Sequence, residues 1–193
     1  NAYHCYCSQK LPAEDELIGA QLVAENETVV LGTHNGLCIR FGNADVREMG
    51  REAYGVRGIR LSKADYVVGM IAADEGGMIL SVTERGFGKR TKIGQYRIQS
   101  RGGKGIINVK TTKRNGKVVA IMQVTDDSGL LVITHHGKLI RVRANAIRGV
   151  GRSSQGVKLI NLEDEDSVSA ASLVENENGK VETFSSEPGE TIH

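Results

Sequence analysis

The sequence predicts an all-β fold, a propeller-like array of four-stranded antiparallel blades that is incomplete, with three full repeats and a partial fourth. Three observations support this class. Similar turns recur at Gly36, Gly86 and Gly137, at spacings of 50 and 51 residues. A second glycine signature trails each turn, and an apolar signature opens each unit. A fixed period of about 40 to 50 residues is typical of stacked β-blades.

Each unit opens with an apolar signature. The opening segments are DELIGAQLV from Asp15, ADYVVGMIAAD from Ala64, GKVVAIMQVTDD from Gly116 and, as the partial copy, DSVSAASLVENE from Asp166. We expect the following division of the chain: a leader or remnant of a preceding blade at 1–12, blades at 13–62, 63–113 and 114–162, a partial blade at 163–184, and a tail at 185–193.

A hairpin follows each opening segment. Aliphatic and β-branched runs precede the turn glycines at Thr28–Leu31, Met78–Val82 and Leu130–Thr134, and a second such run follows each turn. Glycine supplies the positive φ of a tight reversal without a Cβ clash. No apolar period of about 3.6 residues persists for more than about two turns, which argues against long helices. The alternative is a β-sandwich with accidental repetition.

The trailing signature closes each unit. It occurs as GVRGIRL, GGKGIINV and SQGVKLINL, around Gly58, Gly105 and Gly156. These glycines follow the turn glycines by 22, 19 and 19 residues. Such a regular register indicates a true repeat rather than a chance similarity among loops.

Composition limits the remaining possibilities. The chain of 193 residues has no Trp, and aromatic residues make up 4%, so Val, Ile and Leu must fill its cores. Its apolar runs fall far short of the roughly 20 residues of a membrane span, so we expect no membrane partner. Nothing resembles a signal peptide, and with Asn as the first residue we expect a piece of a longer chain.

The cysteines indicate a reducing compartment. Cys5, Cys7 and Cys38 are an odd set without a disulfide framework. His4 beside Cys5 and Cys7 falls short of the ligand set of a structural zinc site, so we predict no metal there.

The small net charge of +2 conceals a very uneven distribution. Residues 85–158 contain 17 Lys and Arg against only two acidic residues, whereas residues 1–84 contain 7 and 12, and residues 159–193 contain 1 and 9. Solvated faces usually mix both signs. A segment this basic attracts polyanions, which predicts a nucleic-acid partner.

The residue types favour duplex DNA over other nucleic acids. Single-strand binding relies on aromatic platforms, and the basic segment offers only Phe87 and Tyr96. Reading bases in the major groove usually requires a helix, and none is predicted. Salt-dependent contact with the phosphate backbone remains. Equivalent basic turns on successive blades would form a curved rim, along which DNA would bend.

The chain resembles the C-terminal β-pinwheel domain of the bacterial DNA gyrase A subunit. The resemblance runs from about Pro12 to about Glu177 and is carried by YGVRGIRL at 54–61, GFGKRT at 86–91, QSRGGKGIINVKTTKRNG at 99–116 and GRSSQGVKLINLEDED at 151–166. It implies a six-bladed domain that wraps double-stranded DNA on its outer rim to support negative supercoiling. This chain would be its later part, with roughly half the blades.

The resemblance also implies which parts of the machinery lie elsewhere. The partners would be the N-terminal region of the gyrase A subunit, together with the gyrase B subunit, in the bacterial cytoplasm at the nucleoid. ATP and Mg²⁺ would be used by those parts, and this chain would contribute no cofactor site and no catalytic residue. We assign no catalytic role to His34, His135 and His136, which lie at predicted turns.

Gln99–Gly105 nearly reproduces the family's signature heptapeptide, QRRGGKG, with Ser100 where a basic residue is usual. The heptapeptide belongs to the first blade in the family, so we interpret this copy as an echo in a later blade. The resemblance implies phosphate contacts from Arg101 and Lys104, with glycines that let the backbone approach DNA. The complete set of expected DNA-binding residues is Lys89, Arg90, Gln99, Arg101, Gly102, Gly103, Lys104, Gly105, Lys138, Arg141, Arg143 and Arg152.

Other interpretations are open or are disfavoured. GFGKRT is not a phosphate-binding P-loop, because Thr83 replaces the first glycine and Arg90 the hydroxyl residue of that motif. The acidic C-terminal end is either a solubilising tail or a competitor for the basic rim. The alternative functions are the C-terminal domain of the topoisomerase IV A subunit, or a propeller-type protein-interaction scaffold with a basic face.

Overall fold

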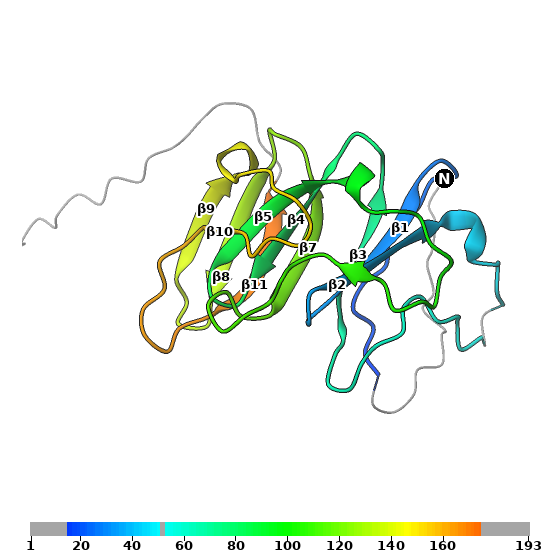
Figure 1. The fold of residues 1–193 in the computed structure, drawn as a ribbon, viewed down its shortest axis with the longest axis horizontal. Helices are drawn as coiled ribbons and strands as arrows, with labels where there is room; N and C mark the ends of the chain where they lie inside the picture. Colours follow the sequence, from blue (N-terminus) through cyan, green and yellow to red (C-terminus); the bar gives the residue numbers. More distant parts are fainter. Residues whose placement is uncertain (1–14, 51–52, 175–193) are drawn as a thin grey trace, which may run out of the picture.

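The computed structural model of the chain describes residues 15–50 and 53–174. Its regular elements are strands and single-turn 3-10 helices (Figure 1). The strands are β1 (Thr28–Thr33), β2 (Leu37–Gly42), β3 (Val67–Ala73), β4 (Met78–Thr83), β5 (Phe87–Lys92), β6 (Ile106–Ile107), β7 (Val118–Val124), β8 (Gly129–Thr134), β9 (Leu139–Arg143), β10 (Val157–Lys158) and β11 (Val168–Val174). The 3-10 helices are η1 (Asn43–Asp45), η2 (Ile93–Gln95) and η3 (Ala144–Ala146).

The predicted all-β class and the antiparallel blades are confirmed. The described strands form three sheets, ordered β3-β1-β2-β6, β10-β5-β4-β7 and β11-β8-β9. Figure 1 shows them side by side in chain order. The three predicted runs before the turn glycines are the central strands β1, β4 and β8.

The register of the central hairpin is the same in all three sheets. Val30 lies opposite Arg40, Leu80 opposite Arg90, and Leu131 opposite Arg141. The turn glycines that close these hairpins all have positive φ, between 74° at Gly86 and 87° at Gly36. The repeat in the sequence is therefore a repeat in backbone geometry.

Each sheet takes strands from two successive units. The central hairpin β1–β2 comes from the first unit, whereas its flanking strands β3 and β6 come from the second. The second sheet likewise pairs β4–β5 with β7 and β10 from the third unit. The sheets are therefore not the same sets of residues as the sequence units 13–62, 63–113 and 114–162. The expected leader at 1–12 and tail at 185–193 lie outside the described residues, as does the end of the partial blade at 163–184.

Two apolar clusters fill the spaces between neighbouring sheets. The first joins Val30 and Ile71 of the first sheet to Ile79 and Ile121 of the second. The second joins the second and third sheets and includes Leu80, Val82, Leu130 and Val132. Both faces of the second sheet are therefore covered by a neighbour.

The sheets approach closely where glycine faces Ile121. A Cβ added to Gly32 would lie 2.5 Å from the Ile121 Cδ1, and one added to Gly69 would lie 3.0 Å from its Cγ1. The missing side chains on β1 and β3 thus make room for a large residue on β7.

The flanking strands define two edges of the array. β3, β7 and β11 lie next to one another, so the blades converge along these strands. β6 and β10 lie at the opposite edge of their sheets, preceded by the loops that leave η2 and η3. A search of the described residues for a membrane-spanning helix finds none.

Ile121 should be a major determinant of stability, because it fills the space left by two glycines. We expect Ile121→Ala to lower the free energy of unfolding by about 2 to 4 kcal/mol, as large-to-small core substitutions do. Urea denaturation followed by circular dichroism measures this. Ile133→Ala, at a partly exposed aliphatic residue on β8, serves as the control and should cost less than about 1 kcal/mol. Equal losses in the two variants would contradict the packing described above.

Candidate nucleic-acid interface

Two equivalent loops run along the outer edge of the array, and we call them the rim loops. They comprise residues 97–105, which follow η2, and residues 148–156, which follow η3. Each rim loop is hydrogen-bonded to the second hairpin strand of the preceding unit, β2 for the first rim loop and β5 for the second. The Gln99 amide donates to the Arg40 carbonyl at 2.8 Å, and the Val150 amide donates to the Arg90 carbonyl at 2.8 Å. The rim loops are therefore ordered parts of the sheets.

Three exposed arginines hold the same position in successive units, and we call them the rim arginines. Arg47, Arg97 and Arg148 each lie two residues after a 3-10 helix and are all exposed. They are separated by 50 and 51 residues, as the turn glycines are. None of them was among the residues expected to bind DNA. The glycine period, applied to arginine, would have found all three.

The expected arginines of the rim loops are partly anchored to the protein. Arg101 donates through Nε to the Asp45 carbonyl at 2.9 Å and through Nη1 to the Arg57 carbonyl at 3.1 Å. Arg152, its equivalent, donates through Nη1 to the Ile107 carbonyl at 2.8 Å. Both side chains are half-buried. The positions of both side chains are thus set by backbone carbonyls.

The other expected residues lie on several elements. Lys104 is exposed and Gln99 is half-buried in the first rim loop. Arg141 and Arg143 are exposed on β9. Lys138 lies at the hairpin turn before β9, where its Nζ donates to the Asn161 carbonyl at 3.4 Å. The structure therefore gathers only part of the expected set on the rim loops.

The glycines of the signature heptapeptide differ in what surrounds them. Gly102 and Gly103 leave room, because an added Cβ would find no atom closer than 3.5 Å and 3.6 Å. Gly105 has a φ of +73°, and an added Cβ would lie 2.4 Å from the Cys38 carbonyl oxygen. Gly156 meets the Gly88 carbonyl oxygen in the same way, at 2.7 Å. The close approach at Gly105 is thus to the neighbouring strand of the protein itself.

Lys89 and Arg90 do not face solvent, which corrects the expectation that they contact phosphate. Lys89 is only 1% exposed, and its Nζ donates to the carbonyls of Gly151, at 2.9 Å, and Arg152. Arg90 is buried, donates through Nε to the Ile147 carbonyl at 2.8 Å, and forms an ion pair with Asp126. Both strand faces are covered by neighbouring sheets, so neither side chain has a surface to offer to DNA.

Burial changes the acid–base behaviour of Lys89. It lowers the pKa of the ammonium group to about 8, with Cys38 acting to raise that pKa and Arg152 acting to lower it. Burial also raises the pKa of the Cys38 thiol to about 12. Ile39 stands at the position of Lys89 in the first unit. The second unit therefore has a titratable group where the first unit has an aliphatic one.

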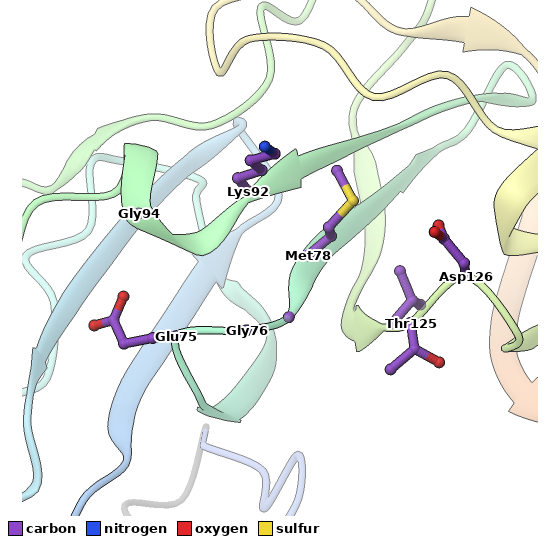
Figure 2. A pocket seen from close by; sticks show the side chains of 9 residues that line it. Glu75, Gly76, Met78, Lys92, Gly94, Thr125 and Asp126 are labelled. Carbon is purple, nitrogen blue, oxygen red and sulfur yellow. The ribbon is translucent and has the colours of Figure 1, made fainter.

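A pocket lies between successive units, at the end of the hairpins opposite the turn glycines. Figure 2 shows Glu75 on one turn and Asp126 on another, with Met78, Lys92 and Thr125 between them. Glu75 forms an ion pair with Arg40, as Asp126 does with Arg90. Among the described residues there is no group of three or more His, Cys, Asp and Glu that could hold a metal ion. The possible metal ligands His4, Cys5 and Cys7 lie outside the described residues.

Comparisons with known proteins agree with this architecture. The family model described as DNA gyrase C-terminal domain, beta-propeller, matches residues 27–74, 77–125 and 130–175. Each matched segment covers a central strand and extends to the flanking strand with which it pairs. The family match thus groups each central hairpin with the flanking strand of the next unit, as the sheets do, while β6 and β10 fall in the following matched segment.

One related protein and two solved structures illustrate the similarity. The DNA gyrase A subunit of Haloquadratum walsbyi is 42% identical over 162 residues, which cover 83% of this chain and 19% of that protein. A structure of the DNA gyrase A C-terminal domain has a TM-score of 0.78 and 29% identity, covering 86% of this chain and 57% of that chain. The C-terminal domain of DNA topoisomerase IV has a TM-score of 0.81 and 24% identity, covering 87% and 53%, and shares the fold. The chain spans about a fifth of the length of its gyrase relatives.

The lowered pKa of Lys89 predicts how stability depends on pH. The folded state holds fewer protons than the unfolded state between the folded pKa of about 8 and the ordinary value of 10.5. As the pH is raised from about 8 to 10.5, Lys89 should therefore contribute more to the free energy of unfolding. This contribution is lost when the pH falls back through the folded pKa of about 8. Urea denaturation of the wild type and of Lys89→Met measures the difference at several pH values. A difference that stays constant from pH 7.5 to pH 10 would contradict the assignment.

Proposed function

The chain belongs to the DNA gyrase C-terminal domain family, and from this membership we propose that it binds duplex DNA along the rim loops without reading its sequence. The observation that carries the proposal is the set of rim arginines, exposed at one equivalent position in three successive units. The segment that contains both rim loops has 17 basic residues against two acidic ones. Equivalent guanidinium groups on adjacent blades suit a polyanion that runs past several blades.

The contacts would be made to phosphate. Arginine and backbone N–H groups are common partners of phosphate oxygens, and such contacts position a protein without carrying base information. The described residues form no α-helix that could enter a major groove. We expect these contacts from five residues of the two rim loops: Arg97, Arg101 and Lys104 on the first, and Arg148 and Arg152 on the second.

The wider role follows from the family. In the complete protein this segment would wrap DNA so that strand passage, carried out by the N-terminal region of the gyrase A subunit with the gyrase B subunit, produces negative supercoils. ATP and Mg²⁺ would serve those parts, and the complex would work on the chromosome in the bacterial cytoplasm. The sequence QSRGGKG at 99–105, which nearly reproduces the signature heptapeptide, favours this role over that of topoisomerase IV.

A salt titration tests the proposal against a protein-interaction scaffold. If about six phosphates are contacted, duplex affinity should fall by roughly a thousandfold between 50 and 200 mM salt, because binding releases condensed counterions. Fluorescence anisotropy with a labelled duplex measures this. Negligible affinity for duplex DNA at every salt concentration would favour the scaffold.

Removing a rim arginine should remove about one phosphate contact. We expect Arg97→Ala and Arg148→Ala each to reduce the slope of log affinity against log salt by about 0.9, similarly on unrelated DNA sequences. Arg85→Ala, at an exposed arginine of the β4–β5 turn, is the control with the same change in charge and should leave the slope nearly unchanged. A loss confined to one DNA sequence would contradict backbone binding.

Wrapping is a separate prediction, because bending a site of 20 to 30 base pairs costs about 1 to 6 kcal/mol. We expect nicked circular DNA that is ligated in the presence of the protein to show a changed linking number. An unchanged linking number at saturating protein would mean that this segment binds DNA without wrapping it.

A further inference from the structure

We propose that Arg40 and Arg90 are positioning residues, which hold the rim loops so that Arg97 and Arg148 face the DNA. We call Arg40 and Arg90 the inner arginines. They hold equivalent positions in β2 and β5, and both are buried. The inference rests on the proposed function, because it assigns a task to residues behind the proposed interface.

Arg90 is hydrogen-bonded to the second rim loop on both sides of Arg148. Its Nε donates to the carbonyl of Ile147, the residue before Arg148, at 2.8 Å. Its backbone amide donates to the Arg148 carbonyl at 3.3 Å, and its carbonyl accepts from the Val150 amide at 2.8 Å. One buried residue therefore fixes the backbone immediately before, at and after a rim arginine.

Arg40 makes the equivalent contacts with the first rim loop. Its Nη1 donates to the carbonyl of Tyr96, the residue before Arg97, at 3.2 Å, and to that of Ile93 at 3.4 Å. Its carbonyl accepts from the Gln99 amide at 2.8 Å. Two bonds thus recur 50 residues apart: a guanidinium group donates to the carbonyl before the rim arginine, and the carbonyl of the inner arginine accepts from the rim loop. Repetition in two separate units indicates that this arrangement is a property of the repeat.

An acidic residue of the following unit neutralises each inner arginine. Arg40 pairs with Glu75 and Arg90 with Asp126, and the two acids lie on separate turns in Figure 2. A buried guanidinium group needs such a partner, because an uncompensated buried charge is strongly destabilising. Its planar fork of five N–H groups can bind a carboxylate and backbone carbonyls together, which the ammonium group of lysine reproduces poorly.

Lys89 adds a second support in one of the two rim loops. Its ammonium group holds the carbonyls of Gly151 and Arg152. Ile39, the equivalent residue, packs near Gly103 instead, where an added Cβ would lie 3.6 Å from the Ile39 Cδ1. Lys89 and Arg90, which the charge pattern placed on the DNA, thus support the loop that we expect to meet it. A loop that is ordered before binding loses less conformational entropy when it binds.

A double-mutant cycle tests the inference, using the whole chain and a labelled duplex at about 100 mM salt. Arg90→Lys keeps the charge and removes the fork, so a loss of affinity would not come from a change in net charge. We expect Arg148→Ala to weaken binding by about five- to tenfold, the size of one lost phosphate contact at this salt concentration. Arg90→Lys should weaken binding by a comparable or smaller factor. The two effects should not multiply: the double variant should bind more tightly than the product of the two single losses predicts.

Arg97→Ala provides the matched control, because it lies on the other rim loop. The effects of Arg90→Lys and Arg97→Ala should multiply, since distant and independent sites are additive in free energy. In the reciprocal cycle, the effects of Arg40→Lys and Arg97→Ala on affinity should not multiply, because both residues act on the first rim loop. A general loss of stability would not produce this selectivity for the rim arginine on the same loop.

The possible outcomes separate the inference from the proposed function. If Arg148→Ala weakens binding and its effect multiplies with that of Arg90→Lys, the inference is wrong while the proposed function stands. If neither Arg97→Ala nor Arg148→Ala weakens binding, the rim is not the DNA site, and both fall together. Should Arg90→Lys fail to fold, the cycle of Arg40→Lys with Arg97→Ala replaces it, with Arg148→Ala as the control on the other rim loop. The same pattern of multiplication then decides.

Discussion

Main-chain pairing between successive units is the constraint on which the rest of this structure depends. A central hairpin such as β1–β2 has two edges, and both are completed by strands of the following unit, β3 on one side and β6 on the other. Within the part of the chain that the structure describes, no complete four-stranded sheet is built from a single unit. Stability in such arrays comes from neighbours as much as from the repeats themselves, and the buried clusters between sheets reinforce the same coupling.

Strand sharing also explains why the charged loops lie where they do. Between η2 and β6 the chain runs along β2 of the preceding sheet, where the amide of Gln99 bonds to the carbonyl of Arg40. The same path recurs from η3 to β10. Because the path is fixed by the sheet, a charged residue at one position in the repeat recurs at one place on the edge. Regular spacing in the sequence thereby becomes regular placement of charge in space.

Much of the fold was predictable from periodic features, and the failures have a physical cause. The turn glycines located the hairpins because positive φ leaves a mark in residue type. The sharing of strands was not predictable, because a period is the same wherever the unit is cut. The burial of Lys89 and Arg90 was missed because alternation along a strand reveals an exposed face only when one face is solvated. Here a blade lies between two others, so Lys89 and Arg90 in β5 are both buried although they point to opposite faces, and only Lys92 at the end of the strand is exposed.

The signature heptapeptide combines requirements of two different origins. Gly105 and Gly156 are confined by the carbonyl groups of Cys38 and Gly88, so their identity is demanded by chain geometry whether or not any ligand is present. Lys104 is exposed and carries no such demand, whereas Arg101 also bonds to the carbonyls of Asp45 and Arg57. A copy of the motif that has lost its function can therefore keep the glycine at the position of Gly105 by selection for folding alone. In families of this kind, an exposed cationic residue of the motif is a better guide than its glycines to which copies still bind their ligand.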